Sequence, residues 1–336
     1  GTVFLREGYS RDLSRLNYGC TSAPAVFEDL VYVPIINSEG QPGAPGDIRA
    51  FDVRTGKERW RFHTVPHPGE FGNDTWEGDS WRDRSGANAW AGYTIDVKHG
   101  ILLAGLGSPA SDFYGGDRKG NNLFGNCVLA LDARTGKRLW HFQTTHHDLW
   151  DHDNPCPPVV ATIRHNGRKR DVAVQVTKTG FCYVLDLKTG EPVFGVREVP
   201  AQPSQLIGEH ASPTQPEPIK PPPFSRNVFT EADIFERPER PGEIRRLLAG
   251  TLYGKPYIPP SEQGSVVFPG FHGGATWSGA GFDPTTGRLY VNTNEVPWIA
   301  RMRRNPAGGY DFLGYARVED RDTVPGSRPP WGHLNA

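Results

Sequence analysis

The sequence predicts an all-β protein, and its composition carries that prediction. Glycine and proline account for 40 and 31 of the 336 residues, and both residues end helices and supply the dihedral angles of tight turns. The chain contains nine tryptophans and a single methionine, a composition that favours strands over helices. Helical turns are expected only in residues 231–235 and 243–249. We therefore expect many short strands joined by frequent turns.

Charge and hydropathy exclude several classes of function. The formal net charge is -1 at pH 7, so nothing favours nucleic acid or a membrane surface as a partner. No apolar run approaches the roughly 18 to 20 residues of a membrane span. The N-terminal GTVFLREGYSRD lacks the basic-then-apolar pattern of a signal peptide. A chain trimmed of its signal peptide would lack this pattern too, so the sequence does not decide the compartment. The composition predicts a soluble globular protein.

One short pattern recurs four times along the chain. An apolar strand ends at Asp, a Thr-Gly turn reverses the chain, and a second strand leaves the turn. The copies are FDVRTGKERWRF, LDARTGKRLW, LDLKTGEPVF and FDPTTGRLYV. Glycine supplies a positive φ, and the Asp and Thr side chains bond the backbone of the turn. Four such hairpins, roughly 50 to 100 residues apart, are typical of a β-propeller with long loops between its blades.

A proline-rich stretch interrupts this series. Residues 200–223, which include SPTQPEPIKPPPF, are too rich in proline for ladder pairing and are expected to form an extended or polyproline loop. A linker between two domains is the alternative. Because the hairpin pattern continues on both sides of the stretch, we expect one propeller domain over residues 1–336.

The cysteines do not indicate a metal site. They are far apart and match no metal-binding spacing, so two buried thiol pairs or four inert apolar side chains explain them equally well. A C-x-x-C-H motif for covalent haem attachment is absent from the sequence. The four are Cys20, Cys127, Cys156 and Cys182.

The segment HHDLWDHD, residues 146–153, crowds titratable side chains together. His146, His147 and Asp148 could serve a zinc hydrolase, but no recognisable motif supplies a distant third ligand. Alternatively, the two histidines orient their neighbours, and Asp148 and Asp153 structure the loop. The residues alone leave these alternatives open.

Longer blocks of the sequence resemble one family. GSPASDFYGGDRKGNNLFGNC, HHDLWDHD, TKTGFCYVLD, SPTQP, FHGGATWSGAGFDPTTGRLYV and RPPWGHLNA occur in the same order as in the quinoprotein dehydrogenases, which use pyrroloquinoline quinone (PQQ). The chain looks closest to their membrane-bound glucose dehydrogenase branch. The resemblance implies an eight-bladed propeller with PQQ in its central funnel beside a divalent ion, usually calcium, with magnesium as the alternative. It also implies an incomplete propeller, a fragment that lacks N-terminal and C-terminal blades, with the remaining blades on another segment or chain.

The same resemblance assigns three central roles. Asp151 corresponds to the catalytic base that also approaches the metal, Lys178 to the cation that contacts the quinone oxygens, and Trp90 to the indole beneath the quinone ring. The residue types suit this chemistry, because a carboxylate takes the alcohol proton, cations polarise the quinone carbonyl, and a flat aromatic supports the ring.

Other positions correspond less closely. The resemblance places metal ligands before the first hairpin, at Asn37, Ser38 or Glu39, and at Ser108 in the GSP turn. Thr21 and Ser22 resemble a hydroxyl pair near a quinone carboxylate, and Trp277 resembles a residue at the quinone rim.

The function implied is oxidation of an aldose or alcohol by hydride transfer to PQQ, with electrons passed to ubiquinone or a cytochrome. The resemblance also implies a periplasmic location. A different class of function is a propeller that has lost catalysis and serves as a protein-binding scaffold. Retention of Asp151, Lys178 and Trp90 argues against that class, because a scaffold has no need of them.

Overall fold

The computed structural model describes residues 2–336, and nearly all of its regular elements are strands, joined by long loops. Most of them form four sheets, which we call blades 1 to 4. Blade 1 contains β2 (Ala25–Phe27), β3 (Leu30–Tyr32), β5 (Ile48–Asp52) and β6 (Glu58–Phe62), and blade 2 contains β7 (Tyr93–Asp96), β8 (Ile101–Gly105), β9 (Cys127–Asp132) and β10 (Arg138–Gln143). Blade 3 contains β11 (Val159–His165), β12 (Arg168–Val176) and β13 (Cys182–Asp186), and blade 4 contains β17 (Ala280–Asp283), β18 (Arg288–Asn294) and β21 (Gly332–Asn335).

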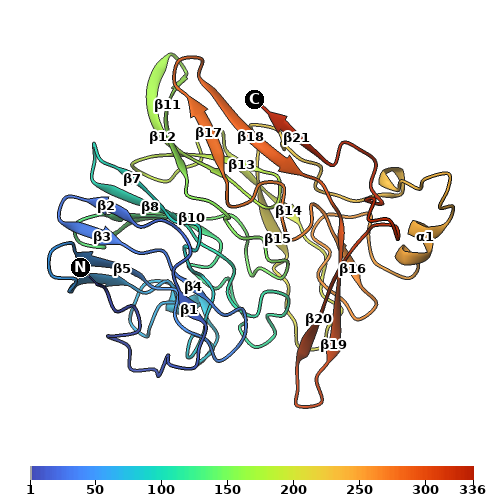
Figure 1. Cartoon of the computed structure of the whole chain (residues 1–336), viewed down its shortest axis with the longest axis horizontal. Helices are drawn as coiled ribbons and strands as arrows, with labels where there is room; N and C mark the ends of the chain where they lie inside the picture. Colours follow the sequence, from blue (N-terminus) through green and yellow to red (C-terminus); the bar gives the residue numbers. More distant parts are fainter. Residues whose placement is uncertain (1) are drawn as a thin grey trace.

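The blades follow one another in space as they do in sequence. The first strand of each blade contacts the first strand of the next, through β2, β7, β11 and β17, and Figure 1 shows the resulting arc from blue to red. No sheet closes on itself within residues 2–336. The all-β prediction is therefore confirmed, and the arrangement is that of an incomplete propeller.

The recurring turn forms as its chemistry predicts. At Asp132 the carboxylate accepts hydrogen bonds from the backbone N–H groups of Arg134 at 3.0 Å and Thr135 at 2.9 Å. The Thr135 hydroxyl donates to the same oxygen at 2.8 Å, and Gly136 takes a φ of 72°. Asp52 makes the equivalent contacts in blade 1. Each turn is therefore specified by its own few residues.

The tryptophan that follows two of these turns joins one blade to the next. Trp60 Nε1 donates to Ala133 O at 3.1 Å, and Trp140 Nε1 donates to Leu187 O at 2.9 Å. A Cβ atom on the turn glycine of the following blade would lie 2.4 Å from the Trp60 indole and 2.5 Å from that of Trp140. The Thr-Gly turn therefore also leaves room for the indole of the preceding blade.

The cores lie between facing blades. On β8 and β9, Leu102 and Leu129 pack toward blade 1, whereas Leu103 and Val128 pack toward blade 3. Successive side chains of a strand point to opposite faces, so a blade covered on both sides needs a continuous apolar run. The strings ILLAG and CVLAL meet that requirement.

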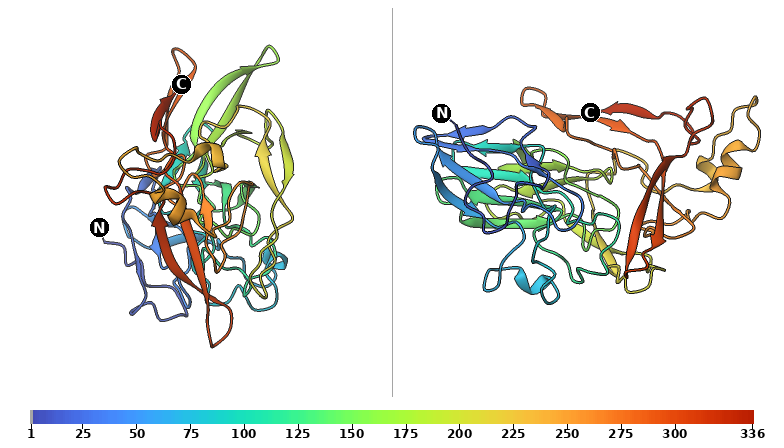
Figure 2. Two further views of the ribbon diagram at one scale, coloured as in Figure 1. Left: turned by 90° about the vertical axis from the view of Figure 1, so that its right-hand side faces the viewer. Right: turned by 60° about the horizontal axis from the view of Figure 1, so that its bottom comes forward.

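The remaining elements surround the blades. β1 (Tyr18–Gly19) pairs with β4 (Ile36–Asn37), and β16 (Ser265–Val267) pairs with the long hairpin of β19 (Trp298–Arg304) and β20 (Tyr310–Arg317), which projects from the body in Figure 2. The expected helical turns are present as the 3-10 turn η2 (Glu231–Asp233) and the helix α1 (Glu243–Leu248), with a further 3-10 turn, η1, at Asn73–Thr75. Among residues 2–336, no helix combines the length and apolarity needed to cross a membrane.

The prediction that residues 200–223 would form no ladder is wrong in part. β15 (Thr214–Pro218) pairs antiparallel with β14 (Val196–Pro200). Pro216 and Pro218 occupy alternate positions of β15, and in an antiparallel ladder alternate N–H groups point away from the partner strand. Prolines at these positions therefore remove no ladder hydrogen bond.

The four cysteines are free. Cys20 is exposed and the other three are buried, so the described residues contain no disulfide, and the three buried thiols act as small apolar side chains.

Candidate active site

A cavity of about 460 Å³ lies where loops from several blades meet, and its lining includes a group of acidic side chains. Asp112 belongs to the loop between β8 and β9, Asp151 and Asp153 to the loop between β10 and β11, and Lys178 follows β12. Glu39 follows β4. Four carboxylates and one ammonium group therefore line one space.

Lys178 is the centre of this group. Its Nζ lies 2.9 Å from Asp151 Oδ2 and 2.9 Å from Asp153 Oδ2, and the side chain is 9% exposed. Burial alone would lower the pKa of Lys178, but the two carboxylates outweigh it and raise that pKa above its ordinary value. The ammonium group is therefore a fixed positive charge at any working pH.

The pKa values of the two aspartates that bind Lys178 are shifted in opposite directions. Burial raises the pKa of Asp151 well above its ordinary value, against the opposing charge of Lys178. Burial acts on Asp153 too, but Lys178 and the Ser108 backbone N–H, which donates to Asp153 Oδ1 at 2.6 Å, hold its pKa below the ordinary value. Neighbouring carboxyl groups whose pKa values are pushed apart are typical of acid–base sites, in which each group takes a separate role.

The backbone at Asp151 adopts an uncommon conformation. Its φ is 59°, in the left-handed region that only a few per cent of non-glycine residues occupy. The loop on either side is held by Asp148, which is 1% exposed. Asp148 accepts hydrogen bonds from the Trp150 and His152 N–H groups at 3.0 and 2.8 Å and from the Asn126 side chain at 2.9 Å. Asp148 therefore structures the loop that presents Asp151.

The two histidines of the segment do not form a metal site with Asp148. The His146 ring contacts Gln143 and Glu198, and the buried His147 ring contacts Gly120 O at 2.7 Å and Glu209 Oε1 at 2.8 Å. Their ring nitrogens are engaged with separate partners. The geometry therefore does not support the zinc hydrolase.

Asp112 also lines the cavity and was not predicted from the sequence. It is 7% exposed, and burial together with the charges of Asp151, Glu39 and Asp153 raises its pKa well above the ordinary value. Such a group of carboxylates is unfavourable until a cation joins it. Its oxygen donors suit Ca²⁺ or Mg²⁺ better than zinc. The one sequence signal was an aspartate four positions after Ser108 in the same loop.

Seven of the predicted site residues line the cavity and three do not. The residues that the structure brings together are Asn37, Ser38, Glu39, Trp90, Ser108, Asp151 and Lys178. Thr21, Ser22 and Trp277 lie outside the lining, and Trp277 is 70% exposed. Ser22 touches the site indirectly, because its Oγ donates to the backbone oxygen of Trp90 at 2.7 Å.

Two of the predicted metal ligands differ in whether their side-chain oxygen is already engaged in a hydrogen bond. Asn37 Nδ2 donates to Ala44 O at 2.9 Å, which leaves its amide oxygen without a donor among residues 2–336. The Ser108 hydroxyl is already engaged, because it donates to Asp148. Asn37 is therefore the better placed neutral oxygen donor.

Aromatic residues form the apolar part of the lining. Phe113 and Phe271 stand edge to face with centroids 5.0 Å apart, and Phe271 and Tyr315 lie 4.7 Å apart. Trp90 belongs to the same lining. A cavity with flat apolar walls and an oxygen-rich group of side chains fits a planar cofactor held beside a hard cation.

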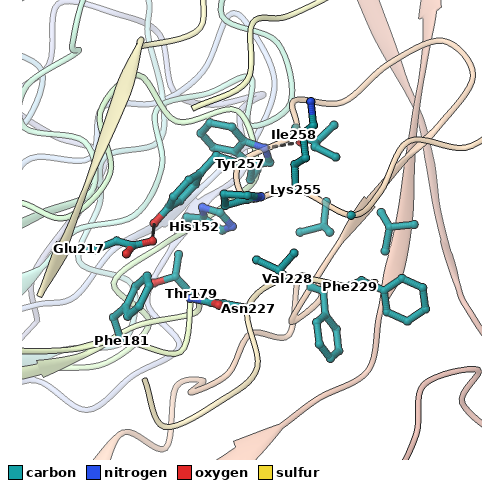
Figure 3. Close-up of a pocket in the computed structure, with 16 residues that line it drawn as sticks. His152, Thr179, Phe181, Glu217, Asn227, Val228, Phe229, Lys255, Tyr257 and Ile258 are labelled. Atoms are coloured by element: carbon teal, nitrogen blue, oxygen red, sulfur yellow. Dashed lines mark hydrogen bonds between the residues drawn. The ribbon is translucent and has the colours of Figure 1, made fainter. Parts of the chain in front are cut away.

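A second cavity, of about 40 Å³, is lined by His152, the neighbour of Asp151. Figure 3 shows the His152 ring beside Tyr257, which donates to Glu217 at 3.3 Å. Burial lowers the pKa of His152 to about 4, and its Nδ1 has no partner among the described residues. This space has room for water but not for a cofactor.

Comparisons with known proteins identify the family of the chain. The family model described as "Glucose/ethanol/alcohol dehydrogenase, beta-propeller domain" of the PQQ type matches residues 1–336. A quinate/shikimate dehydrogenase (quinone) of Acinetobacter baylyi is 32% identical over 319 residues, which are 91% of this chain and 38% of that protein. Quinoprotein glucose dehydrogenase A of Acinetobacter calcoaceticus is 36% identical over 272 residues, 76% of this chain and 33% of that protein.

A solved structure extends the likeness to the fold. The quinohemoprotein alcohol dehydrogenase of Pseudomonas putida HK5 superposes with a TM-score of 0.60 at 27% identity, over 86% of this chain and 38% of its own. The chain thus spans less than half the length of the relatives it matches. It belongs to the family of β-propeller domains of PQQ-dependent glucose, ethanol and alcohol dehydrogenases.

Proposed function

We propose that the protein to which this chain belongs oxidises an alcohol or the C1 hydroxyl of an aldose, with PQQ as the hydride acceptor. The observation that carries the proposal is the ion-pair group of Lys178 with Asp151 and Asp153, 2.9 Å apart in each case, in a cavity that Trp90 also lines. The family match supports it, because PQQ supplies a quinone carbonyl that accepts hydride when it is bound.

In this proposal Asp151 is the general base. Its raised pKa makes it a better proton acceptor than an ordinary aspartate, and it lines the cavity beside Lys178. Its carboxylate would take the hydroxyl proton of the substrate. Asp153, whose pKa Lys178 and the Ser108 N–H hold below the ordinary value, keeps the Lys178 ammonium in place.

Lys178, Trp90 and the remaining oxygen donors hold the cofactor and its metal. The Lys178 ammonium provides positive charge where the quinone oxygens gain electron density. The indole of Trp90 offers a flat face to the ring. The donors that would hold Ca²⁺, or Mg²⁺ in its place, are Asn37, Ser38, Glu39, Ser108, Asp112 and Asp151.

The wider assignments are part of the same proposal. The names of two relatives contain the words quinone and quinohemoprotein, which supports ubiquinone or a cytochrome as the electron acceptor. The proposed location is the bacterial periplasm. In this proposal one propeller domain covers residues 1–336, and the remaining blades of the propeller lie on another segment or chain. The relatives act on quinate or shikimate, glucose, glycerol and alcohols by their names, so the substrate class is a small hydroxylated molecule.

The test is reconstitution of the full protein with PQQ and Ca²⁺. Reduction of an artificial dye would be followed with glucose, quinate, glycerol and ethanol as substrates. We expect PQQ-dependent turnover with at least one of them, lost on removal of the metal by chelation. A folded protein that binds no PQQ would contradict the proposal and favour the protein-binding scaffold.

A further inference from the structure

A separate group of metal-ligating side chains lies in the loop between β6 and η1. His63, His67 and Glu70 each present one ligand atom, and these atoms all lie within 4.8 Å of one another. Within residues 2–336, no other set of three His, Cys, Asp or Glu side chains meets that criterion. None of the three lines the cavity that holds Lys178. We call them the two-histidine cluster.

The local sequence builds this cluster. In His67-Pro68-Gly69-Glu70 the proline stands at the second position and a glycine with a φ of 88° at the third, which is the pattern of a type II turn. The Glu70 N–H donates to His67 O at 3.0 Å. The turn thereby brings the Glu70 carboxylate back to His67. The backbone N–H of His67 donates to Glu70 Oε2 at 2.8 Å, and Glu70 Oε1 lies 2.8 Å from His63 Nδ1.

The two imidazole rings lie face to face. Their centroids are 4.0 Å apart with an interplanar angle of 17°, and Trp81 packs against His67 at 5.1 Å. Neither ring nitrogen of His67 has a hydrogen-bond partner among the described residues. The imidazole can therefore donate a lone pair to a metal.

The charges around the cluster nearly balance. The carboxylates of Glu70 and Asp47 favour a cation, whereas the guanidinium groups of Arg11 and Arg61 act against one. A hard cation such as Ca²⁺, which depends on several anionic oxygens, gains little here. An ion that prefers imidazole nitrogen depends less on net charge.

We propose that His63, His67 and Glu70 bind one divalent transition-metal ion of the zinc class, separate from the site at Lys178. Two imidazole nitrogens and one carboxylate oxygen are donors that zinc takes at about 2.0–2.2 Å, which places tetrahedral ligand atoms roughly 3.4 Å apart. The side chains of His63 and Glu70 are 25% and 44% exposed, so both have room to rotate toward that spacing. Water completes the coordination.

The proposal is tested with Co²⁺ as a spectroscopic probe of the full chain. Saturating Ca²⁺ is present to occupy the oxygen-lined cavity, and Zn²⁺ is added afterwards as the competitor. We expect one equivalent of Co²⁺ to produce visible absorption that Zn²⁺ abolishes. His63→Ala and His67→Ala should each weaken Co²⁺ binding at least about tenfold, the lower end of what even outer-shell partners of a metal contribute.

His99→Ala is the matched control. His99 Nδ1 contacts the Asp96 carboxylate at the turn between β7 and β8, as His63 contacts Glu70, but no second histidine stands beside it. This variant should bind Co²⁺ like the wild type. The urea midpoint of every variant reports whether it folds. Absence of saturable Co²⁺ binding by the wild type, or unchanged binding in both folded cluster variants, would overturn the proposal.

Discussion

Substitution of Asp151 by asparagine in the PQQ-loaded, calcium-loaded enzyme should abolish most catalysis and leave the fold intact. The Asp151 side chain makes one hydrogen bond among the described residues, from Lys178 Nζ at 2.9 Å, and an asparagine oxygen still accepts it. Loss of a general base lowers kcat by about 10² to 10⁴ fold. Because burial already destabilises the ionised carboxylate, a neutral amide should not lower the free energy of unfolding of the metal-free protein.

Asp148→Asn, three residues earlier, should behave differently. Its Oδ2 accepts from Ser108 Oγ, Asn126 Nδ2 and the His152 N–H, and an amide group there can replace at most part of this set. Hydrogen bonds to a charged group contribute about 1.5–3 kcal/mol each, so we expect a loss of roughly 2–5 kcal/mol of stability. Asp148→Asn is thus the structural comparison for Asp151→Asn.

Three measurements separate the two roles. They are kcat from dye reduction, PQQ content from absorbance, and the free energy of unfolding from urea titration. If Asp151→Asn kept kcat within about threefold of the wild type at equal PQQ content, the assignment of Asp151 as base would be wrong. If it destabilised the protein as much as Asp148→Asn, its role would be structural.

Further predictions concern the blades and the acidic groups. Trp140→Phe leaves the buried carbonyl of Leu187 without its donor, and should lower the free energy of unfolding by about 1–3 kcal/mol in urea titration; an unchanged midpoint would show that the blades do not depend on this contact. Burial raises the pKa of Asp47 from 3.8 to about 6, so between about pH 4 and 6 the native state retains a proton that the unfolded chain has released. Stability should therefore fall by roughly 3 kcal/mol as pH rises through this window, and Asp47→Asn should remove that slope. Asp112→Asn should weaken Ca²⁺ binding, measured by calorimetry on the PQQ-free protein, at least about tenfold, and unchanged affinity would exclude Asp112 as a ligand.

Local chemistry explains what could be predicted from the sequence. The Asp and Thr side chains of each Thr-Gly turn bond backbone groups two and three residues away, so four hairpins and the all-β class could be identified without knowledge of the fold. The convergence of Trp90, Asp151 and Lys178 on one cavity is not local. It was expected because the chain resembles a family, and spacing alone does not place these residues together.

The features that the sequence did not predict depend on contacts between residues that are distant in the chain or on details of strand pairing. Asp112 carries no motif, and only its distance in space to Asp151 and Glu39 makes it notable. Asp153 was interpreted as a loop carboxylate, yet it contacts Lys178 as closely as Asp151 does. The pairing of β15 was rejected for its prolines, although alternate spacing makes prolines compatible with one edge of a ladder.

The most direct test of the central claim is a crystal structure of the full protein loaded with PQQ and Ca²⁺. Our account predicts the quinone ring on the Trp90 indole, the Lys178 ammonium within hydrogen-bond distance of the quinone oxygens, and calcium among the oxygens of Asn37, Asp112 and Asp151. A PQQ molecule bound away from Trp90 and Lys178, or a folded holoprotein whose cavity stays empty of quinone, would contradict it.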